Sequence, residues 1–163
     1  MLQGLRFAIG WLFTVAVLFS LLLFSAITFR KWTYEIAGPV VRWWSKTTLK
    51  MLNIRLVLLN ETTMSEPKPR ICVCNHQSTL DLFWFGAVAP PRFAAVGKKE
   101  IKYLFPINFG WWALRLFYVD RSKQIAAIRS LETVAQEMVA DNRTIVISPE
   151  GTRSKNGELG EFK

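Results

Sequence analysis

The stretch ICVCNHQSTLDLFWF, residues 71–85, decides the fold because it joins two apolar segments through a short polar loop. Residues 71–74 are apolar and β-branched or thiol-bearing, a pattern typical of a short buried strand. Residues 78–89 have the pattern of a helix, with Ser78 or Thr79 as its N-terminal cap and two prolines at its end. The sequence therefore predicts a strand, a loop and a helix in close succession.

The same alternation of strand and helix patterns continues along the chain. We predict strands at residues 53–59, 93–96, 116–119 and 143–147, a short helix within the basic stretch 97–110, and a long helix at 122–141 with apolar residues at helical spacing. Apolar strands separated by helices are typical of a parallel sheet covered on both faces. The predicted fold class is α/β, with a mostly parallel sheet flanked by helices.

The N-terminal part of the chain has the composition of a membrane-associated segment. Residues 7–29 are 23 residues without a charged side chain, and a helix of this length extends about 35 Å, against roughly 30 Å for the bilayer core. We expect an uncleaved anchor that spans the membrane or lies in one leaflet, with a signal peptide as the alternative. The chain then divides into a membrane-associated helical part, 1–50, and an α/β domain, 51–163.

Charge supports the same division. The chain has a formal net charge of +9, which favours anionic surfaces. Basic and aromatic residues follow the apolar run together, as at a membrane interface: Arg30, Lys31, Trp32, Tyr34, Arg42, Trp43, Trp44, Lys46 and Lys50. By the positive-inside bias, we expect the domain on the cytoplasmic side of a membrane. We further expect this membrane to be a bacterial inner membrane. Nucleic acid is not an expected partner, because the basic residues flank the apolar run.

The two cysteines, Cys72 and Cys74, lie two residues apart on one predicted strand. This spacing puts them on one face of the strand, where they are poorly placed for a disulfide. The chain has a single histidine, so a zinc site is not expected. We expect two buried, reduced thiols, with a redox or acyl-thiol role as the alternative.

Three polar clusters follow three of the predicted strands, at residues 75–81, 118–121 and 149–153. In open α/β sheets, ligands bind beyond the carboxyl ends of the strands, where these clusters are expected. The first cluster holds His76, the only histidine, and Asp81. A carboxylate on one ring nitrogen leaves the other free to take a proton from a hydroxyl. The alternative is a histidine that only caps the helix.

The third cluster, Glu150-Gly151-Thr152-Arg153, combines a flexible backbone, a hydroxyl and a guanidinium. Arginine binds phosphate through paired hydrogen bonds, and glycine lets the backbone approach a ligand closely. Arg121, in the second cluster, supplies another positive charge. The alternative interpretation is a surface turn held by a salt bridge.

Together these clusters resemble the 1-acylglycerol-3-phosphate acyltransferase family of glycerolipid acyltransferases. His76 to Asp81 matches the HX4D motif of that family, residues 150–153 match its EGTR motif, and residues 110–121 are similar to the block between them. The resemblance covers residues 40–163. The sequence departs from the family pattern in two places. Ser148 stands where the family commonly has Phe, and the sequence stops before the Val- and Pro-rich fourth motif that the family has after EGTR. We therefore expect a C-terminally truncated chain.

The resemblance implies transfer of a fatty acyl group from acyl-CoA or acyl carrier protein to the sn-2 hydroxyl of lysophosphatidic acid. It implies His76 as general base, Asp81 as its partner, and Arg121, Glu150, Gly151, Thr152 and Arg153 as substrate-binding residues, without metal or cofactor. Alternatives are an acyltransferase for another lysophospholipid, a hydrolase that uses Ser78 as nucleophile, and an inactive protein that only binds anionic lipid.

Overall fold

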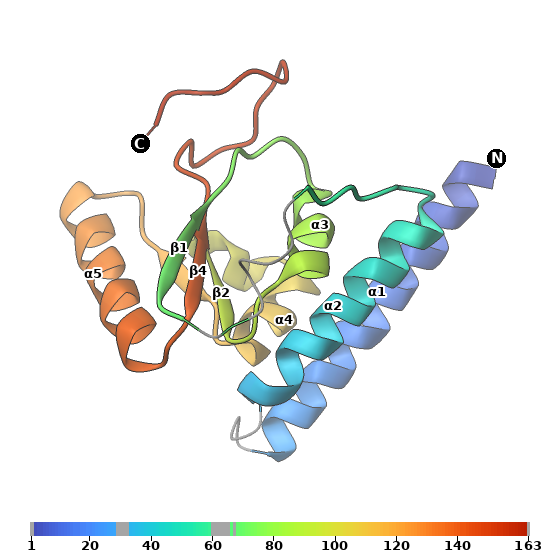
Figure 1. Cartoon of the computed structure of the whole chain (residues 1–163), viewed down its shortest axis with the longest axis horizontal. Helices are drawn as coiled ribbons and strands as arrows, with labels where there is room; N and C mark the ends of the chain where they lie inside the picture. Colours follow the sequence, from blue (N-terminus) through green and yellow to red (C-terminus); the bar gives the residue numbers. More distant parts are fainter. Residues whose placement is uncertain (1, 29–32, 60–65, 67, 163) are drawn as a thin grey trace.

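The computed structural model describes residues 2–28, 33–59, 66 and 68–162 (Figure 1). The helices are α1 (Leu2–Ile27), α2 (Thr33–Met51), α3 (Asp81–Val88), η1 (Lys99–Tyr103, a 3-10 helix), α4 (Ile107–Ala113) and α5 (Gln124–Ala140). The strands are β1 (Arg70–Val73), β2 (Phe93–Lys98), β3 (Phe117–Val119) and β4 (Thr144–Ile147).

The described strands form one four-stranded sheet in the order β1-β4-β2-β3. Every pairing is parallel, with Ile71 opposite Ile145 between β1 and β4, and Val96 opposite Phe117 between β2 and β3. Parallel neighbours require crossover connections, and helices supply them here. The predicted α/β class is confirmed.

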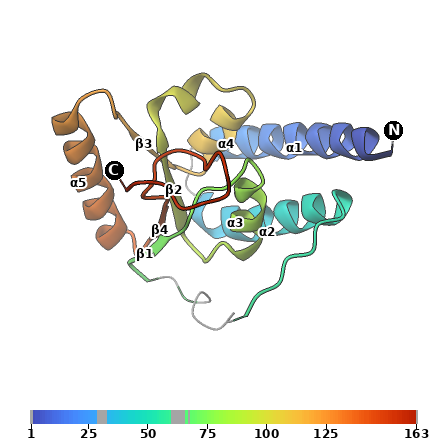
Figure 2. The same cartoon turned by 90° about the horizontal axis from the view of Figure 1, so that it is seen from above.

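Helices cover the two faces of the sheet unequally. Helices α2, α3 and α4 lie on one side with α1 outside them, and α5 lies on the other side (Figures 1 and 2). The α3 side holds the larger core, in which Trp44 of α2 packs edge-on against Phe83 of α3 with ring centroids 5.3 Å apart. Trp44 is only 3% exposed. Its predicted place at a membrane interface is therefore wrong, because it is a core residue, whereas Trp43 is exposed.

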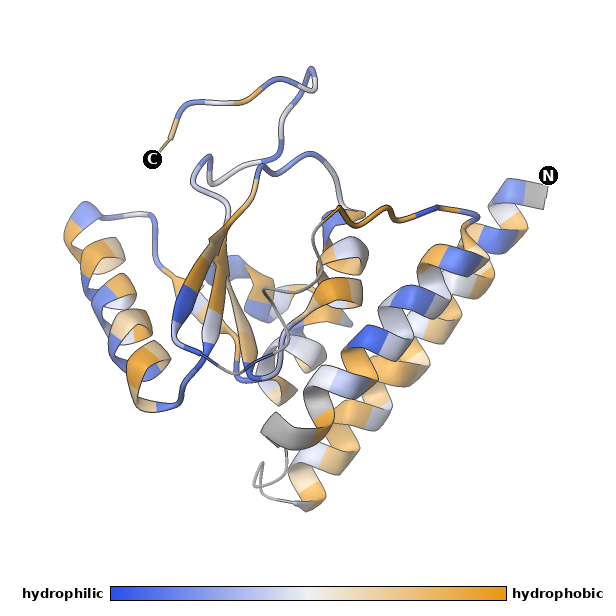
Figure 3. Ribbon diagram, in the orientation of Figure 1, coloured by the Kyte–Doolittle hydropathy of each residue, from blue (hydrophilic) through white to orange (hydrophobic). Residues whose placement is uncertain are grey.

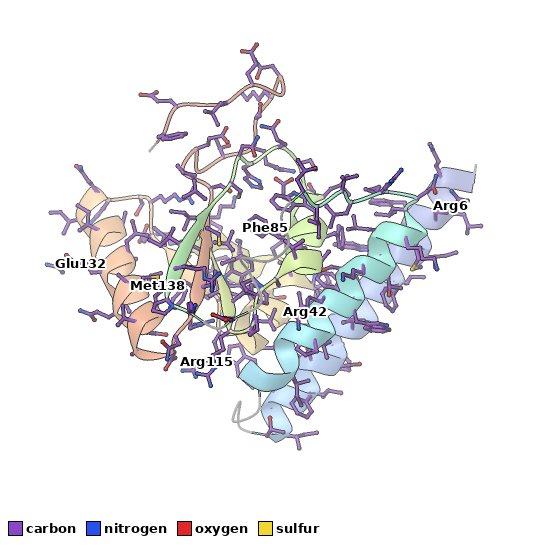
Figure 4. The ribbon with its side chains drawn as sticks, in the orientation of Figure 1. Arg6, Arg42, Phe85, Arg115, Glu132 and Met138 are labelled. Carbon is purple, nitrogen blue, oxygen red and sulfur yellow. The ribbon has the colours of Figure 1, made fainter. Side chains whose placement is uncertain are left out.

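The core beneath α5 is small. Val134 packs there with Ala94, Phe117 and Ile145, and Met138 points toward the sheet while Glu132 points away from it (Figure 4). Much of the predicted apolar stripe of this helix remains exposed, namely Ile125, Ile128, Leu131 and Val139. Helical spacing indicated the helix correctly, but only part of its apolar face is covered by the described residues.

Helices α1 and α2 form an antiparallel pair. Trp44 Nε1 donates a hydrogen bond to Thr14 Oγ1 at 3.3 Å, and Phe13 lies edge-on to Trp43 at 5.4 Å. In Figure 3, α1 is mostly apolar apart from polar positions in its first turns, whereas α2 alternates between apolar and polar positions. Within the described residues, α1 is the one helix long and apolar enough to cross a membrane. Arg30, Lys31 and Trp32, which we predicted to lie at the membrane interface, are outside the described part of the chain.

Three local predictions differ from the structure. The strand predicted at 53–59 is irregular: its side chains are largely exposed, and none of the described strands pairs with it. The helix predicted at 78–89 with Ser78 or Thr79 as its cap is α3, which begins at Asp81. Its N-cap residue is Leu80, which makes no side-chain capping bond. Cys72 and Cys74 are free thiols, as predicted, but they are half-buried. Of the predicted loop 60–70, residues 60–65 and 67 lie outside the described residues.

Candidate active site

All three polar clusters lie at one edge of the sheet. Because the strands are parallel, the segments that follow β1, β3 and β4 emerge at the same carboxyl edge. Strands β1 and β4 are neighbours, so the His76 loop and the Glu150 loop lie side by side, at the upper end of the strands in Figure 1. The structure thus brings together motifs about 70 residues apart in sequence.

His76 and Asp81 form a hydrogen-bonded pair. The distance from His76 Nδ1 to Asp81 Oδ2 is 2.7 Å, which is short, as expected for a charge-assisted bond. His76 precedes α3 and Asp81 is its first residue, so the intervening loop folds back and lets the two side chains meet. The imidazole is about one-third exposed, and within the described residues nothing hydrogen-bonds to its Nε2. Because Nδ1 is occupied by Asp81, Nε2 is the ring nitrogen left for a contact with a substrate.

Asp81 is fixed from several directions. Its Oδ2 also accepts hydrogen bonds from the backbone N–H of Gln77 at 2.9 Å and of Ser78 at 3.1 Å, and its Oδ1 accepts one from Trp84 Nε1 at 3.0 Å. The residue is only 8% exposed. Burial raises the pKa of Asp81, but the bonds from His76, Ser78, Trp84 and Gln77 together lower it below its ordinary value. The carboxylate is therefore ionised and rigid.

Glu150 connects the two loops instead of facing outward. Glu150 is only 1% exposed. Its Oε1 accepts a hydrogen bond from the His76 backbone N–H at 2.9 Å, and its Oε2 accepts one from the Gly160 backbone N–H at 2.9 Å. These two bonds lower the pKa of Glu150. The Ser154 N–H donates to the His76 carbonyl oxygen at 2.7 Å. Both sides of the His76 backbone are thus held by the segment that contains Glu150.

The two arginines converge on the same loops. Arg153 Nη1 donates to Thr79 Oγ1 at 2.7 Å, and Arg121 Nη1 donates to the Gly151 carbonyl oxygen. Gly151 has a φ of 65°, a conformation that favours glycine. Arg121, Arg153 and Thr152 are exposed. A ligand at the carboxyl edge would therefore meet the imidazole, two guanidinium groups and a hydroxyl.

Cys74 lies directly before this loop. Its Sγ is 3.1 Å from Ser148 Oγ, and burial raises the pKa of the thiol above its ordinary value. Burial also raises the pKa of Cys72. Neither cysteine is an activated nucleophile, because the thiolate is the reactive form.

Trp84 is a site residue that the sequence reasoning missed. Its indole N–H holds Asp81 Oδ1 from one turn further along α3. The available signal was its position three residues after Asp81, since residues three apart on a helix share a face. Lys99 and Asp120 were missed as a pair too; they form an ion pair of 2.8 Å that ties η1 to the end of β3.

The side chains gathered at this edge are chemically suited to proton transfer and anion binding. Among the described residues, no group of three or more His, Cys, Asp and Glu side chains could hold a metal ion. A histidine oriented by a buried carboxylate takes a proton from a hydroxyl, and guanidinium groups bind phosphate or carboxylate.

Comparison with known proteins places this arrangement in a family. Residues 55–163 match the acyltransferase family. A Saccharomyces cerevisiae protein named 1-acyl-sn-glycerol-3-phosphate acyltransferase is 36% identical over 112 residues, which are 67% of this chain and 36% of the relative. A human protein named 1-acyl-sn-glycerol-3-phosphate acyltransferase beta is 28% identical over 124 residues, which are 76% of this chain and 45% of the relative. The chain thus spans less than half the length of these curated relatives.

A solved structure shares the fold. The crystal structure of the 1-acyl-sn-glycerophosphate (LPA) acyltransferase PlsC from Thermotoga maritima matches all of this chain with a TM-score of 0.71, at 22% identity, over 68% of its own length. The family match covers well over half of the chain and includes both the His76–Asp81 pair and the Glu150–Arg153 loop. This chain therefore belongs to the acyltransferase family.

Proposed function

We propose that this protein transfers a fatty acyl group from a thioester to the sn-2 hydroxyl of lysophosphatidic acid, which produces phosphatidic acid. The observation that carries the proposal is the 2.7 Å pair of His76 and Asp81, joined through Glu150 to a loop that bears Arg153. The names of the matched relatives support the same reaction. The donor is acyl-CoA or acyl carrier protein, both of which present the same thioester.

The reaction follows from the orientation of the imidazole. Because Nδ1 bonds to the Asp81 carboxylate, it carries the proton and Nε2 is the base. Nε2 takes the proton of the sn-2 hydroxyl as the oxygen attacks the thioester carbonyl. The tetrahedral intermediate then collapses: the carbon–sulfur bond breaks, and the imidazolium gives its proton to the leaving thiolate. An ester and a free thiol result, and the enzyme carries no acyl group.

Phosphate recognition is assigned to the loop after β4. Arg153 and Arg121 are exposed cations that bond to Thr79 in the His76 loop and to the Gly151 carbonyl oxygen, and Thr152 offers a hydroxyl. Gly151 lets the backbone turn so that Arg121 reaches its carbonyl. Glu150 is a positioning residue, because both carboxylate oxygens already accept backbone N–H groups.

The acceptor is a lipid, and α1 supplies the membrane contact. We place α1 along one leaflet, not across the bilayer. Its partner α2 carries Lys46 and Lys50, which are exposed, and Arg42, which donates to the Ala89 carbonyl oxygen. A spanning α1 would bring α2 and the domain packed on it into the hydrocarbon, where charges are costly.

The test is acyl transfer from radiolabelled acyl-CoA or acyl carrier protein to lysophosphatidic acid, in membranes that carry the chain. His76→Ala should lower kcat by roughly 10²- to 10⁴-fold, the contribution of a general base. Gln77→Ala is the matched control, since only its backbone N–H contacts Asp81. If the wild-type chain transferred nothing from either donor, or if His76→Ala retained full activity, the proposal would be wrong.

A second prediction concerns the acceptor phosphate. Arg153→Ala should raise the KM for lysophosphatidic acid by about 10- to 100-fold with a smaller change in kcat, since a charged hydrogen bond contributes roughly 1.5–3 kcal/mol. Lys155→Ala, an exposed cation two residues away, should change neither. Steady-state kinetics at varied acceptor concentration give the answer, and an unchanged KM would refute the phosphate assignment.

A further inference from the structure

An exposed apolar turn connects η1 to α4. Tyr103, Leu104 and Phe105 are 77%, 55% and 64% exposed. Three consecutive large apolar side chains in water form the kind of patch that marks an interaction surface. The turn follows β2 through η1, so it is attached to the carboxyl edge of the sheet, where His76 also lies.

This turn is continuous with the apolar surface of α1. Phe105 packs edge-on against Phe109 with centroids 5.5 Å apart, and Phe109 lies 6.4 Å from Phe19 of α1. Phe19 belongs to an exposed stripe of α1 that also contains Leu12 and Leu23. In Figure 2, the segment between β2 and α4 lies beside the C-terminal half of α1.

Positive charge surrounds the turn. The Lys102 ammonium lies 4.8 Å from the centroid of the Tyr103 ring, and Lys98 and Lys102 are both exposed. Lys99 is already neutralised by Asp120. Aromatic and aliphatic side chains rimmed by lysines are typical of segments that enter the interface of an anionic bilayer.

We propose that the turn formed by Tyr103, Leu104 and Phe105 is a second membrane contact, inserted beside α1 into the same leaflet of an anionic bilayer. The inference rests on the proposed membrane association of α1 and extends it to the catalytic domain. Two separate contacts fix the orientation of the domain, whereas α1 alone would leave it free to rotate about the helix axis. The carboxyl edge of the sheet would then be held at the lipid headgroups.

Photo-crosslinking tests the contact directly. The photoreactive residue p-benzoylphenylalanine replaces Leu104 in one variant and Val139 of α5 in a matched control, where Val139 is 62% exposed. Helix α5 lies on the opposite side of the sheet from α1 (Figures 1 and 2). After irradiation with phosphatidylglycerol–phosphatidylethanolamine vesicles, lipid adducts are counted by mass spectrometry. We expect roughly tenfold more adduct at position 104, since burying one such side chain favours insertion by about that factor. Equal yields would overturn the proposal.

A functional readout separates this contact from catalysis. The double variant Tyr103→Asp, Leu104→Asp should transfer about tenfold less acyl group to lysophosphatidic acid in vesicles, and as much as wild type to the same acceptor in detergent micelles. Val139→Asp should affect neither assay. Undiminished transfer on vesicles would contradict the proposal. If wild type transferred nothing in either assay, the proposed function would fail, while the crosslinking result would still decide the membrane contact.

Discussion

At the scale of single residues, Asp81 organises the site. It accepts hydrogen bonds from the imidazole of His76, the backbone of Gln77 and Ser78, and the indole of Trp84. All of these donors favour the ionised carboxylate, and they lower its pKa despite burial. The histidine is consequently held in one orientation before any substrate binds.

Stability should depend on this carboxylate in a defined pH range. The pKa of Asp81 in the folded chain is below its ordinary value of 3.8, so the unfolded chain binds a proton first as the pH falls. The ionised group stabilises the fold above pH 3.8, and this contribution is lost as the pH falls through the folded pKa. Asp81→Asn should therefore lower the free energy of unfolding at pH 7 by about 1–3 kcal/mol, and by less at pH 3.

Urea unfolding in detergent at pH 7 and pH 3, on wild type and Asp81→Asn, measures that difference. Glu150 also has a lowered pKa, but it is present in both proteins, so its effect cancels in the comparison. A difference that stays constant between the two pH values would show that Asp81 is not ionised in the folded chain.

At the scale of elements, the contact between α2 and α3 sets the position of the site. Helix α3 begins with Asp81, and α2 is the surface on which it packs. Close approach is possible because Gly86 has no side chain: a Cβ atom there would meet Ser45 Oγ at 2.0 Å and Val41 Cγ1 at 3.1 Å. In the sequence alone, Gly86 is simply a glycine inside a predicted helix, and a glycine at such a position ordinarily weakens the helix.

Gly86→Ala should therefore destabilise the protein, although alanine is the better helix former. Overpacking of this kind costs about 1–3 kcal/mol, and it should displace α3 from α2. The matched control is Gly4→Ala in α1, where no atom lies within 4 Å of the added Cβ. Thermal unfolding followed by circular dichroism compares the two; a Gly86→Ala protein as stable as wild type would argue against the close packing.

At the scale of the whole molecule, the N-terminal helices and the sheet form one body. Helix α1 contacts α2 and α4, and the core beneath them extends from Leu18 of α1 to Leu114. An anchor joined to a domain by a linker would be independent of the domain's orientation. Here the domain moves with the helix, so the placement of α1 in a bilayer limits where the carboxyl edge can lie, and the proposed second contact at residues 103–105 would fix the remaining rotation about the helix axis.

The in-leaflet placement of α1 predicts that both of its ends lie on one side of the membrane. Gly4→Cys and Ile27→Cys, in a chain with Cys72→Ser and Cys74→Ser, should both react with a membrane-impermeant maleimide from the side that holds the domain. Val57→Cys, at an exposed position of the domain, marks that side. Labelling of Gly4→Cys and Ile27→Cys from opposite sides of sealed vesicles would establish a spanning helix instead.

Much of the architecture was predictable because it depends on local patterns. The apolar runs at β1, β2, β3 and β4 indicated strands, and their alternation with helices indicated a parallel sheet. Residues 53–59 were misread since a strand requires a neighbour as well as an alternating pattern. Trp43 and Trp44 are indistinguishable in sequence, yet one is exposed and the other buried, because the packing partner Phe83 lies on α3.

By itself the sequence determined which residues could act: one histidine, a carboxylate five residues later, and an arginine loop after another strand. Residue type and position after a strand are local properties, so they can be read without coordinates. Only the tertiary structure decided what each of these side chains contacts. The pairing of β1 with β4 brings the two loops side by side. The buried Glu150 carboxylate accepts a hydrogen bond from the His76 backbone, and the helical turn of α3 brings the Trp84 indole to Asp81. These roles depend on contacts between distant segments, which no local pattern encodes.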